Sequence, residues 1–299
     1  MKKRRWWLLL PLVCVGTVAA MTLRNGPDVK QDIAPTETLI PGPDAGGEAS
    51  PTRLSSMEEV ISLAREALES MESSLDDYSA RFVKQEIDSS GKLNERTEMD
   101  VKIQPRLRND SNDAPMRIYL KFRSPESTAG REVIWGADLY DGKMAVHETT
   151  MLLSWKTVWL DPTGMLAMAG QRFPSYEIGL TRLVEKLIER GLRDVDNPDV
   201  TVTVTRDYEF DGRSCELIQA TRSKPGGGED DFALAEVIYD PQRLLILSYQ
   251  SFGWPDAAED NIDTSELPLL ESYQYRDLQT NVGLTDQDFE VTNPGYGFP

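Results

Sequence analysis

MRIYLKFRSPE, residues 116–126, contains the pattern that decides the fold class. Apolar side chains alternate there with polar or basic ones: Met116, Ile118, Leu120 and Phe122 against Arg117, Tyr119, Lys121 and Arg123. A period of two is typical of a β-strand whose two faces meet different surroundings. We therefore expect a strand with one apolar face and one basic face.

Turn-forming sequences divide much of the remaining chain into short runs of the same kind. They occur as SSGK (89–92), YDGK (140–143), FDGR (210–213) and YDPQR (239–243). Each separates two apolar or alternating runs, which is typical of β-hairpins. Strands are predicted near 78–88, 93–105, 115–124, 130–137, 143–149, 154–161, 200–210, 213–222, 232–240, 243–252 and 270–280.

Two segments show helical periodicity instead. The first follows Ser56, whose spacing to Glu59 matches a capping box, and carries apolar residues at helical intervals as far as Leu75. The second lies within SYEIGLTRLVEKLIERG (175–191) and ends at Gly191. Because the strands are joined by short links, the pattern favours one large curved antiparallel sheet or open barrel over βαβ units.

The N-terminal residues 1–23 have the layout of an export signal. A basic run, KKRR at 2–5, precedes an apolar stretch that ends near Ala20. This stretch is short for a membrane span of roughly 20 residues, which favours a cleaved signal peptide, while a retained signal anchor in the inner membrane stays open. Residues 24–53 are rich in Pro, Gly, Asp and Thr and predict a disordered linker before a domain at 54–299. The expected location is the periplasm or the cell envelope.

Composition argues against several functional classes. The formal net charge of -18 repels nucleic acid over about 8 Å at physiological salt. Cys215 is the only cysteine after the predicted signal, so no internal disulfide is expected, and the single His147 gives a histidine-based triad or metal site only one candidate. No GxSxG, GxGxxG or P-loop pattern occurs. We therefore expect no enzymatic activity, no metal and no cofactor.

Several separate blocks resemble a family of exported bacterial proteins, the domain of unknown function 1571. They are YSARFVKQEIDSSGKLNERTEMDVKI (78–103), RIYLKFRSPESTAGREVIW (117–135), LDPTGMLAM (160–168), IGLTRLVEKLI (178–188) and YQYRDLQTNVGLTDQDFEVTNPGYGF (273–298). The resemblance covers roughly residues 55–299. It implies no particular activity.

A more distant resemblance is to the LolA/LolB lipoprotein carriers. These also begin with a helix, continue with a strand similar to YSARFVKQ, and pass through a strand, an SP turn and a returning strand that ends in DG, as in IYLKFRSPESTAGREVIWGADLYDGK (118–143). The resemblance implies a mainly β fold with α (α+β), in which a curved antiparallel sheet forms an open half-barrel with helices on its concave side. It also implies an apolar cavity for acyl chains. The acidic insertions and the Trp155–Trp159 strand depart from the carriers.

A sheet covered by helices on one side and by a ligand on the other must be apolar on both faces. The hairpin at 232–252 has this property, because Leu244, Leu245, Ile246 and Leu247 are consecutive. Either protein or ligand can bury such a hairpin. The residues expected to line a cavity are Phe82, Val101, Ile118, Leu120, Phe122, Trp135, Leu245 and Leu247.

The predicted function is binding or carriage of a hydrophobic ligand, a lipid or a lipoprotein acyl chain, without covalent chemistry. The alternative is a structural or protein-interaction module of the envelope whose core is filled by its own side chains. Expected partners are the hydrophobic ligand, a lipoprotein or an envelope protein, and no nucleic acid. Membrane contact is expected only through an uncleaved N-terminal segment. The basic face of Arg117, Lys121 and Arg123 is either charge-balanced and solvated or a docking patch for an acidic partner or lipid headgroup.

Overall fold

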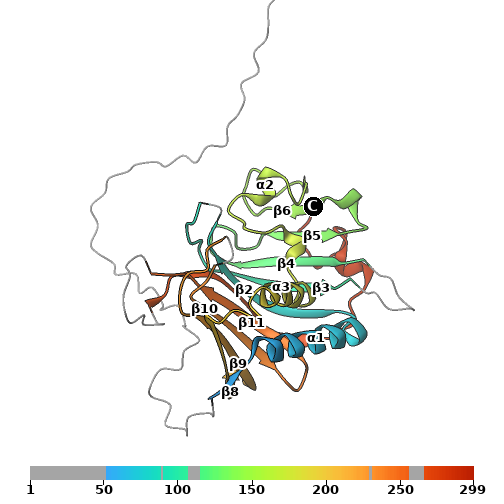
Figure 1. Cartoon of the computed structure of the whole chain (residues 1–299). Helices are drawn as coiled ribbons and strands as arrows, with labels where there is room; N and C mark the ends of the chain where they lie inside the picture. Colours follow the sequence, from blue (N-terminus) through green and yellow to red (C-terminus); the bar gives the residue numbers. More distant parts are fainter. Residues whose placement is uncertain (1–51, 89, 107–114, 229–230, 256–265) are drawn as a thin grey trace, which may run out of the picture. The chain divides into compact units, whose positions relative to one another are not determined.

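The computed structural model describes residues 52–88, 90–106, 115–228, 231–255 and 266–299 (Figure 1). The predicted signal and nearly all of the predicted linker therefore lie outside the described residues. The described residues form a 12-stranded antiparallel sheet in the order β1, β8, β9, β10, β11, β12, β2, β3, β4, β5, β6 and β7. The sheet is curved and not closed, because β1 and β7 stand at its two ends. The predicted fold class is confirmed.

The elements follow the predicted pattern closely. The strands are β1 (Thr52–Ser55), β2 (Tyr78–Glu86), β3 (Thr97–Gln104), β4 (Arg117–Ser124), β5 (Glu132–Gly136), β6 (Met144–His147), β7 (Val158–Leu160), β8 (Val200–Phe210), β9 (Arg213–Arg222), β10 (Leu234–Asp240), β11 (Leu245–Phe252) and β12 (Leu269–Thr280). The helices are α1 (Met57–Ser74), α2 (Met165–Met168) and α3 (Leu180–Leu192), with 3-10 turns η1 (Tyr140–Gly142), η2 (Ser175–Glu177) and η4 (Asp286–Phe289). Each predicted strand is present. The sequence patterns did not predict β1 or α2, and β1 begins at Thr52, two residues before the predicted start of the domain.

Helices α1 and α3 pack against each other and against β11, over one face of the sheet that we call the inner face (Figure 1). The Ser56 side chain caps α1 by accepting a hydrogen bond from the Glu59 N–H at 3.2 Å. The apolar stripe of α1 is buried at Ile61, Ala64, Ala67 and Met71. The apolar residues recur at helical intervals, so they lie on one side of α1 and pack toward the sheet, as the sequence predicted.

The sheet register separates the two faces of β4 cleanly. In an antiparallel sheet, residues that pair directly point to the same face. Ile118 and Leu120 pair with Trp135 and Val133 of β5 and belong to the inner face. The basic residues of β4 belong to the opposite, outer face.

Carboxylates neutralise the basic side of β4. Arg117 forms ion pairs with Asp138 and Asp286, Lys121 lies 3.2 Å from Glu132, and Arg123 lies 2.7 Å from Asp100. The predicted charge balance of this face is confirmed, but the prediction that the face is solvated is wrong at Arg117 and Glu132, whose side chains are only 15% and 2% exposed. Exposed pairs such as Arg123 with Asp100 contribute about 0 to 1 kcal/mol each.

The chain after β12 covers the outer face of β4–β6. Asp77, which is buried, accepts hydrogen bonds from the N–H groups of Val282 (2.6 Å), Gly283 (3.2 Å) and Leu284 (2.8 Å) and fixes the start of this C-terminal segment. Phe289 is fully buried in a cluster with Tyr119, Ile134 and Ala145. The Tyr296 ring stacks on Tyr119 with ring centroids 4.0 Å apart. The C-terminal segment, residues 284–299, is thus part of the core.

Candidate functional site

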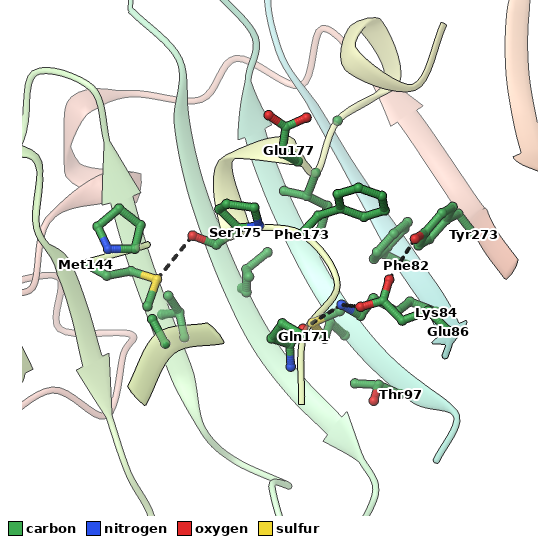
Figure 2. A pocket seen from close by; sticks show the side chains of 18 of the residues that line it. Phe82, Lys84, Glu86, Thr97, Met144, Gln171, Phe173, Ser175, Glu177 and Tyr273 are labelled. Atoms are coloured by element: carbon green, nitrogen blue, oxygen red, sulfur yellow. Dashed lines mark hydrogen bonds and ion pairs between the residues drawn. The ribbon is translucent and has the colours of Figure 1, made fainter. Parts of the chain in front are cut away.

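A cavity of about 260 Å³ lies on the inner face of the sheet, beneath α3 and the segment 161–179 that joins β7 to α3. Figure 2 shows part of its lining, with Phe82 on the sheet side and Phe173 and Ser175 on the connecting segment. Most of the wall formed by the sheet is apolar: Phe82, Met99, Leu120, Phe122, Val133 and Val146. Arg131 and Glu148 also line the cavity and form an ion pair at 2.9 Å. Leu183 and Leu187 of α3 contribute the opposite wall.

The sheet register produces this apolar wall. Met99 pairs with Phe82 on one side and with Phe122 on the other, so three strands place a large side chain in one row. Val133 pairs with Leu120 and Val146 in the next row. Period-two alternation on five neighbouring strands is therefore enough to build a continuous apolar surface.

Two buried tyrosines hold the connecting segment over the cavity. The Tyr78 hydroxyl accepts a hydrogen bond from the Leu180 N–H at 2.9 Å, and the Tyr275 hydroxyl accepts one from the Gly179 N–H at 3.1 Å. Gly179 has a φ of 144°, a conformation that favours glycine. These bonds satisfy backbone donors at the start of α3 and fix the helix on the sheet.

The predicted cavity residues divide into two groups. Phe82, Leu120 and Phe122 line the cavity. The cavity lining does not include the other five, which are Val101, Ile118, Trp135, Leu245 and Leu247. Val101, Ile118 and Leu247 are buried in the core. The Trp135 ring packs against the Tyr176 ring, with the ring centroids 5.4 Å apart, and Leu245 pairs with Asp240 of β10. The wall residues Met99, Val133 and Val146 were missed, although the period-two pattern that identified Leu120 also applies to their strands.

One end of the cavity is polar. We call the residues Lys84, Glu86, Arg190, Glu271 and Tyr273 the polar cluster. Glu86 and Glu271 are buried, and the Tyr273 hydroxyl lies 2.6 Å from the Glu86 carboxylate and 3.2 Å from that of Glu271. The Lys84 ammonium donates to Glu86 at 2.9 Å, and the Arg190 guanidinium donates to Glu271 at 2.7 Å. Figure 2 shows Lys84 and Tyr273 on either side of Glu86.

The surroundings of Glu86 favour its ionised form. Burial alone would raise its pKa, but the Lys84 charge, the Tyr273 hydroxyl and the Arg172 N–H together outweigh burial and lower the pKa from its ordinary value. Burial and the two carboxylates raise the pKa of Tyr273 far above its ordinary value, so the phenol stays protonated and donates. The cluster thus pairs its cations and anions internally.

Replacing Glu86 with glutamine is expected to weaken the acid dependence of stability. Because the folded-state pKa is lowered, ionised Glu86 stabilises the fold above its ordinary pKa of 4.5, and this contribution is lost as the pH falls through the lower folded-state pKa. Urea unfolding at pH 6 and pH 3 should show a larger loss of stability for the wild type than for Glu86→Gln.

Glu236→Gln provides the control with the opposite sign. Burial raises the pKa of Glu236, which is fully buried, so its ionised form destabilises the fold above pH 4.5. This variant is expected to be more stable than the wild type at pH 7. Equal effects of the two substitutions would contradict the assignment of the two environments.

The described residues contain no group of three or more His, Cys, Asp or Glu side chains that would hold a metal ion. None of the helices in this part of the chain combines the length and the apolar character needed to cross a bilayer. The site is thus a largely apolar cavity whose charged lining residues pair with one another: the polar cluster, Arg131 with Glu148, and Lys186 with Glu177.

An open antiparallel sheet with two helices over its inner face and a cavity between them defines the structural class of this protein. The chain belongs to the family described as protein of unknown function (DUF1571), whose model matches residues 75–298. This result confirms the family predicted from the sequence blocks. No curated protein matches the chain.

The chain is also similar to several solved structures. A DUF1329 family protein from Desulfovibrio piger is 15% identical, with a TM-score of 0.36 over 78% of this chain and 97% of that chain. A putative outer membrane lipoprotein-sorting protein domain from Vibrio parahaemolyticus is 12% identical, with a TM-score of 0.34 over 78% and 97%. A LolA superfamily protein from Nitrosomonas europaea is 10% identical, with a TM-score of 0.30 over 76% and 97%.

Proposed function

We propose that this protein binds a hydrophobic molecule, a lipid or the acyl chain of a lipoprotein, in the cavity beneath α3, and that it does so in the cell envelope without covalent chemistry. The cavity itself supports the proposal. Protein interiors pack with few voids larger than a water molecule, whereas this apolar space measures about 260 Å³. Ligand pockets typically enclose about 300 to 1,000 Å³, so the space is just below the lower end of that range.

The driving force for binding would be removal of apolar surface from water, at about 25 cal/mol per Å². The aromatic and aliphatic wall of β2–β6 supplies the surface for an alkyl chain. The polar cluster at one end carries two cations and two carboxylates that already pair with each other. This arrangement suits an amphiphile whose polar group has no net charge, and we assign the cluster no catalytic role.

The packing of the other half of the sheet favours the second candidate, an envelope module with a filled core. There α1 and α3 lie against Ile218, Val237 and Ile246, and only about 40 Å³ is left between them. Side chains therefore fill this half of the interior. The two candidates differ in whether the larger space beneath α3 is occupied by a ligand in the isolated protein.

Organic extraction of the purified protein followed by mass spectrometry separates the two candidates. The carrier hypothesis expects a lipid at close to one molecule per chain. A clean extract, combined with failure to bind a fluorescent fatty-acid probe, would overturn the carrier hypothesis and leave the module.

A variant that fills the cavity is expected to lose the ligand. Val133 and Val146 both lie on the cavity wall, so Val133→Phe combined with Val146→Phe places two aromatic rings in the open space. Bound lipid should fall at least about tenfold, while circular dichroism stays unchanged, since cavity-filling substitutions are commonly tolerated. Val282→Phe, at a position 40% exposed and outside the cavity, is the matched control and should retain the lipid.

A further inference from the structure

Large apolar side chains are concentrated on the surface around β7. Among the described residues, ten such side chains are exposed, and six of them lie between residues 151 and 166. We call these six the edge patch: Met151, Leu152, Trp155, Trp159, Met165 and Leu166. Their exposed fractions range from 44% to 92%. Scattered exposed apolar residues are ordinary, but six within sixteen consecutive residues at one edge of the sheet mark a surface that contacts something apolar.

The edge patch lies at one end of the sheet. β7 is the last strand in the sheet order, and the patch comprises Trp159 of this strand, the β6–β7 loop before it and α2 after it. In Figure 1, α2 lies beyond β6, on the side of the molecule away from β8 and β9. The patch is therefore separate from α1, which packs on β11.

The loop that carries Met151, Leu152 and Trp155 has a hydrogen-bonded turn in its backbone. Leu153 and Ser154 each donate an N–H to the Thr150 carbonyl at 2.9 Å. The Trp155 indole N–H donates to the Leu152 carbonyl at 3.0 Å. Because this donor is already satisfied, the Trp155 ring can enter an apolar phase without losing a hydrogen bond to water.

The edge patch carries little charge, although 27% of the whole chain is charged. Lys156 and Asp161 are its only ionisable residues between 151 and 166. The Asp161 carboxylate accepts hydrogen bonds from the N–H and hydroxyl of Thr163 at 2.8 and 2.7 Å. The Lys156 ammonium lies 5.4 Å from the centroid of the Trp155 ring, and a lysine can extend its charge toward headgroups while its stem stays in an apolar layer.

The same segment forms part of the cavity wall. Leu160 and Pro162, between the two halves of the patch, line the cavity, as does Ala167 of α2. Leu166 lines the cavity and is also 77% exposed, so it belongs to both surfaces. An alkyl chain that leaves the cavity here would meet apolar side chains rather than water.

We infer that the edge patch docks on the surface of a lipid bilayer and connects that bilayer with the cavity. The inference rests on the proposed function, because a route between bilayer and cavity matters only if the cavity holds a lipid. Trp, Met and Leu on a weakly charged surface suit the boundary between headgroups and acyl chains. Since the chain has a net charge of -18, the preferred surface is zwitterionic, and anionic headgroups repel it. This contact adds to the N-terminal one, which was the only membrane contact expected from the sequence.

Hydrogen exchange of the full chain, with and without phosphatidylcholine vesicles, tests the docking locally. Peptides that cover residues 148–168 are expected to exchange at least about threefold more slowly on vesicles. Peptides around Leu54 and Val282, which are also exposed, are expected to show no change. Replacing half of the phosphatidylcholine with phosphatidylglycerol should reduce the protection.

A patch variant distinguishes docking by these side chains from docking by the N-terminal segment. Met151→Ser, Leu152→Ser, Trp155→Ser and Met165→Ser together should abolish the protection, because all four side chains are exposed and the N-terminus is unchanged. Leu54→Ser combined with Leu192→Ser is the matched control, at two exposed positions outside the patch, and should behave as wild type.

The outcomes separate this inference from the proposed function. Lipid extracted from the protein without vesicle-dependent protection at 148–168 overturns the docking and leaves the carrier hypothesis intact. Protection that the patch variant abolishes, together with a clean extract and no binding of the fatty-acid probe, supports the docking and overturns both the carrier hypothesis and the connection to the cavity. Protection that depends on protein concentration and not on vesicles assigns the patch to contact between copies of the chain and overturns the docking.

Discussion

Phe289→Ala is expected to lower the free energy of unfolding by about 3 to 5 kcal/mol, as is typical when a buried phenylalanine is truncated. Phe289 is fully buried against Tyr119, Ile134 and Ala145, although it lies only ten residues from the end of the chain. The substitution leaves a hole on the outer face of β4–β6 that the neighbouring strands cannot fill. Urea denaturation followed by circular dichroism measures the change.

Phe298→Ala is the matched control for this prediction. Phe298 packs around the same cluster but is only partly buried, so its removal is expected to cost about 1 kcal/mol, as is usual for a single substitution outside the core. If Phe289→Ala cost no more than Phe298→Ala, the C-terminal segment would not be part of the cooperative unit.

Arg190→Met is expected to cost about 3 to 5 kcal/mol, because it removes the cation closest to a buried carboxylate. The Arg190 guanidinium donates to Glu271 at 2.7 Å and to the Tyr249 hydroxyl at 2.9 Å, and Glu271 is only 3% exposed. Arg172 also lies near Glu271, with its guanidinium 3.9 Å from the carboxylate, which is longer than the 2.7 Å bond from Arg190. Unfolding at pH 7 measures the cost.

A double variant identifies the source of the cost. Adding Glu271→Gln to Arg190→Met removes the buried charge and should restore about 1 to 3 kcal/mol, the range typical of coupled neighbours. Arg193→Met is the exposed control, because its partner Glu189 is exposed as well, and it should change stability by at most about 0.5 kcal/mol. No recovery in the double variant would mean that packing of the Arg190 stem, and not its charge, stabilises the fold.

Local patterns in the sequence were sufficient to predict most of the fold. Alternation identified β4 and its neighbours, and the FDGR sequence gave a tight turn in which Asp211 and Gly212 have φ values of 52° and 71°. β8 ends at Phe210 and β9 begins at Arg213, directly on either side of that turn. The capping signal at Ser56 correctly marked the start of α1. These features depend on residues close together in the chain.

The polar cluster could not be predicted, because long-range pairing assembles it. Tyr273 and Glu86 are 187 positions apart, and only the pairing of β12 with β2 brings them together. No local spacing distinguishes the carboxylates of Glu86 and Glu271 from those of the other acidic residues of the chain. The cluster depends on strand order, which periodicity does not encode.

The position of Leu245 shows a second limit. Simple alternation would place Leu245 on the same face as Leu247 and Tyr249, which lines the cavity. A register shift beside Ile238 and Tyr239 interrupts the alternation, and Leu245 pairs with Asp240. Beyond a β-bulge of this kind, each residue points to the opposite face of the sheet from the one that simple alternation predicts. Nothing in a run of four apolar residues indicates where such a bulge occurs.

The strand order also determines when the sheet can be completed. β12, the last strand along the chain, lies between β11 and β2. Until residues 269–280 are available to pair, the strands from β2 to β7 and those from β8 to β11 form two separate groups, each with an unpaired edge where β12 will insert. The sheet is therefore completed only when nearly the whole chain is present, and pairings over such long separations in sequence slow this final step.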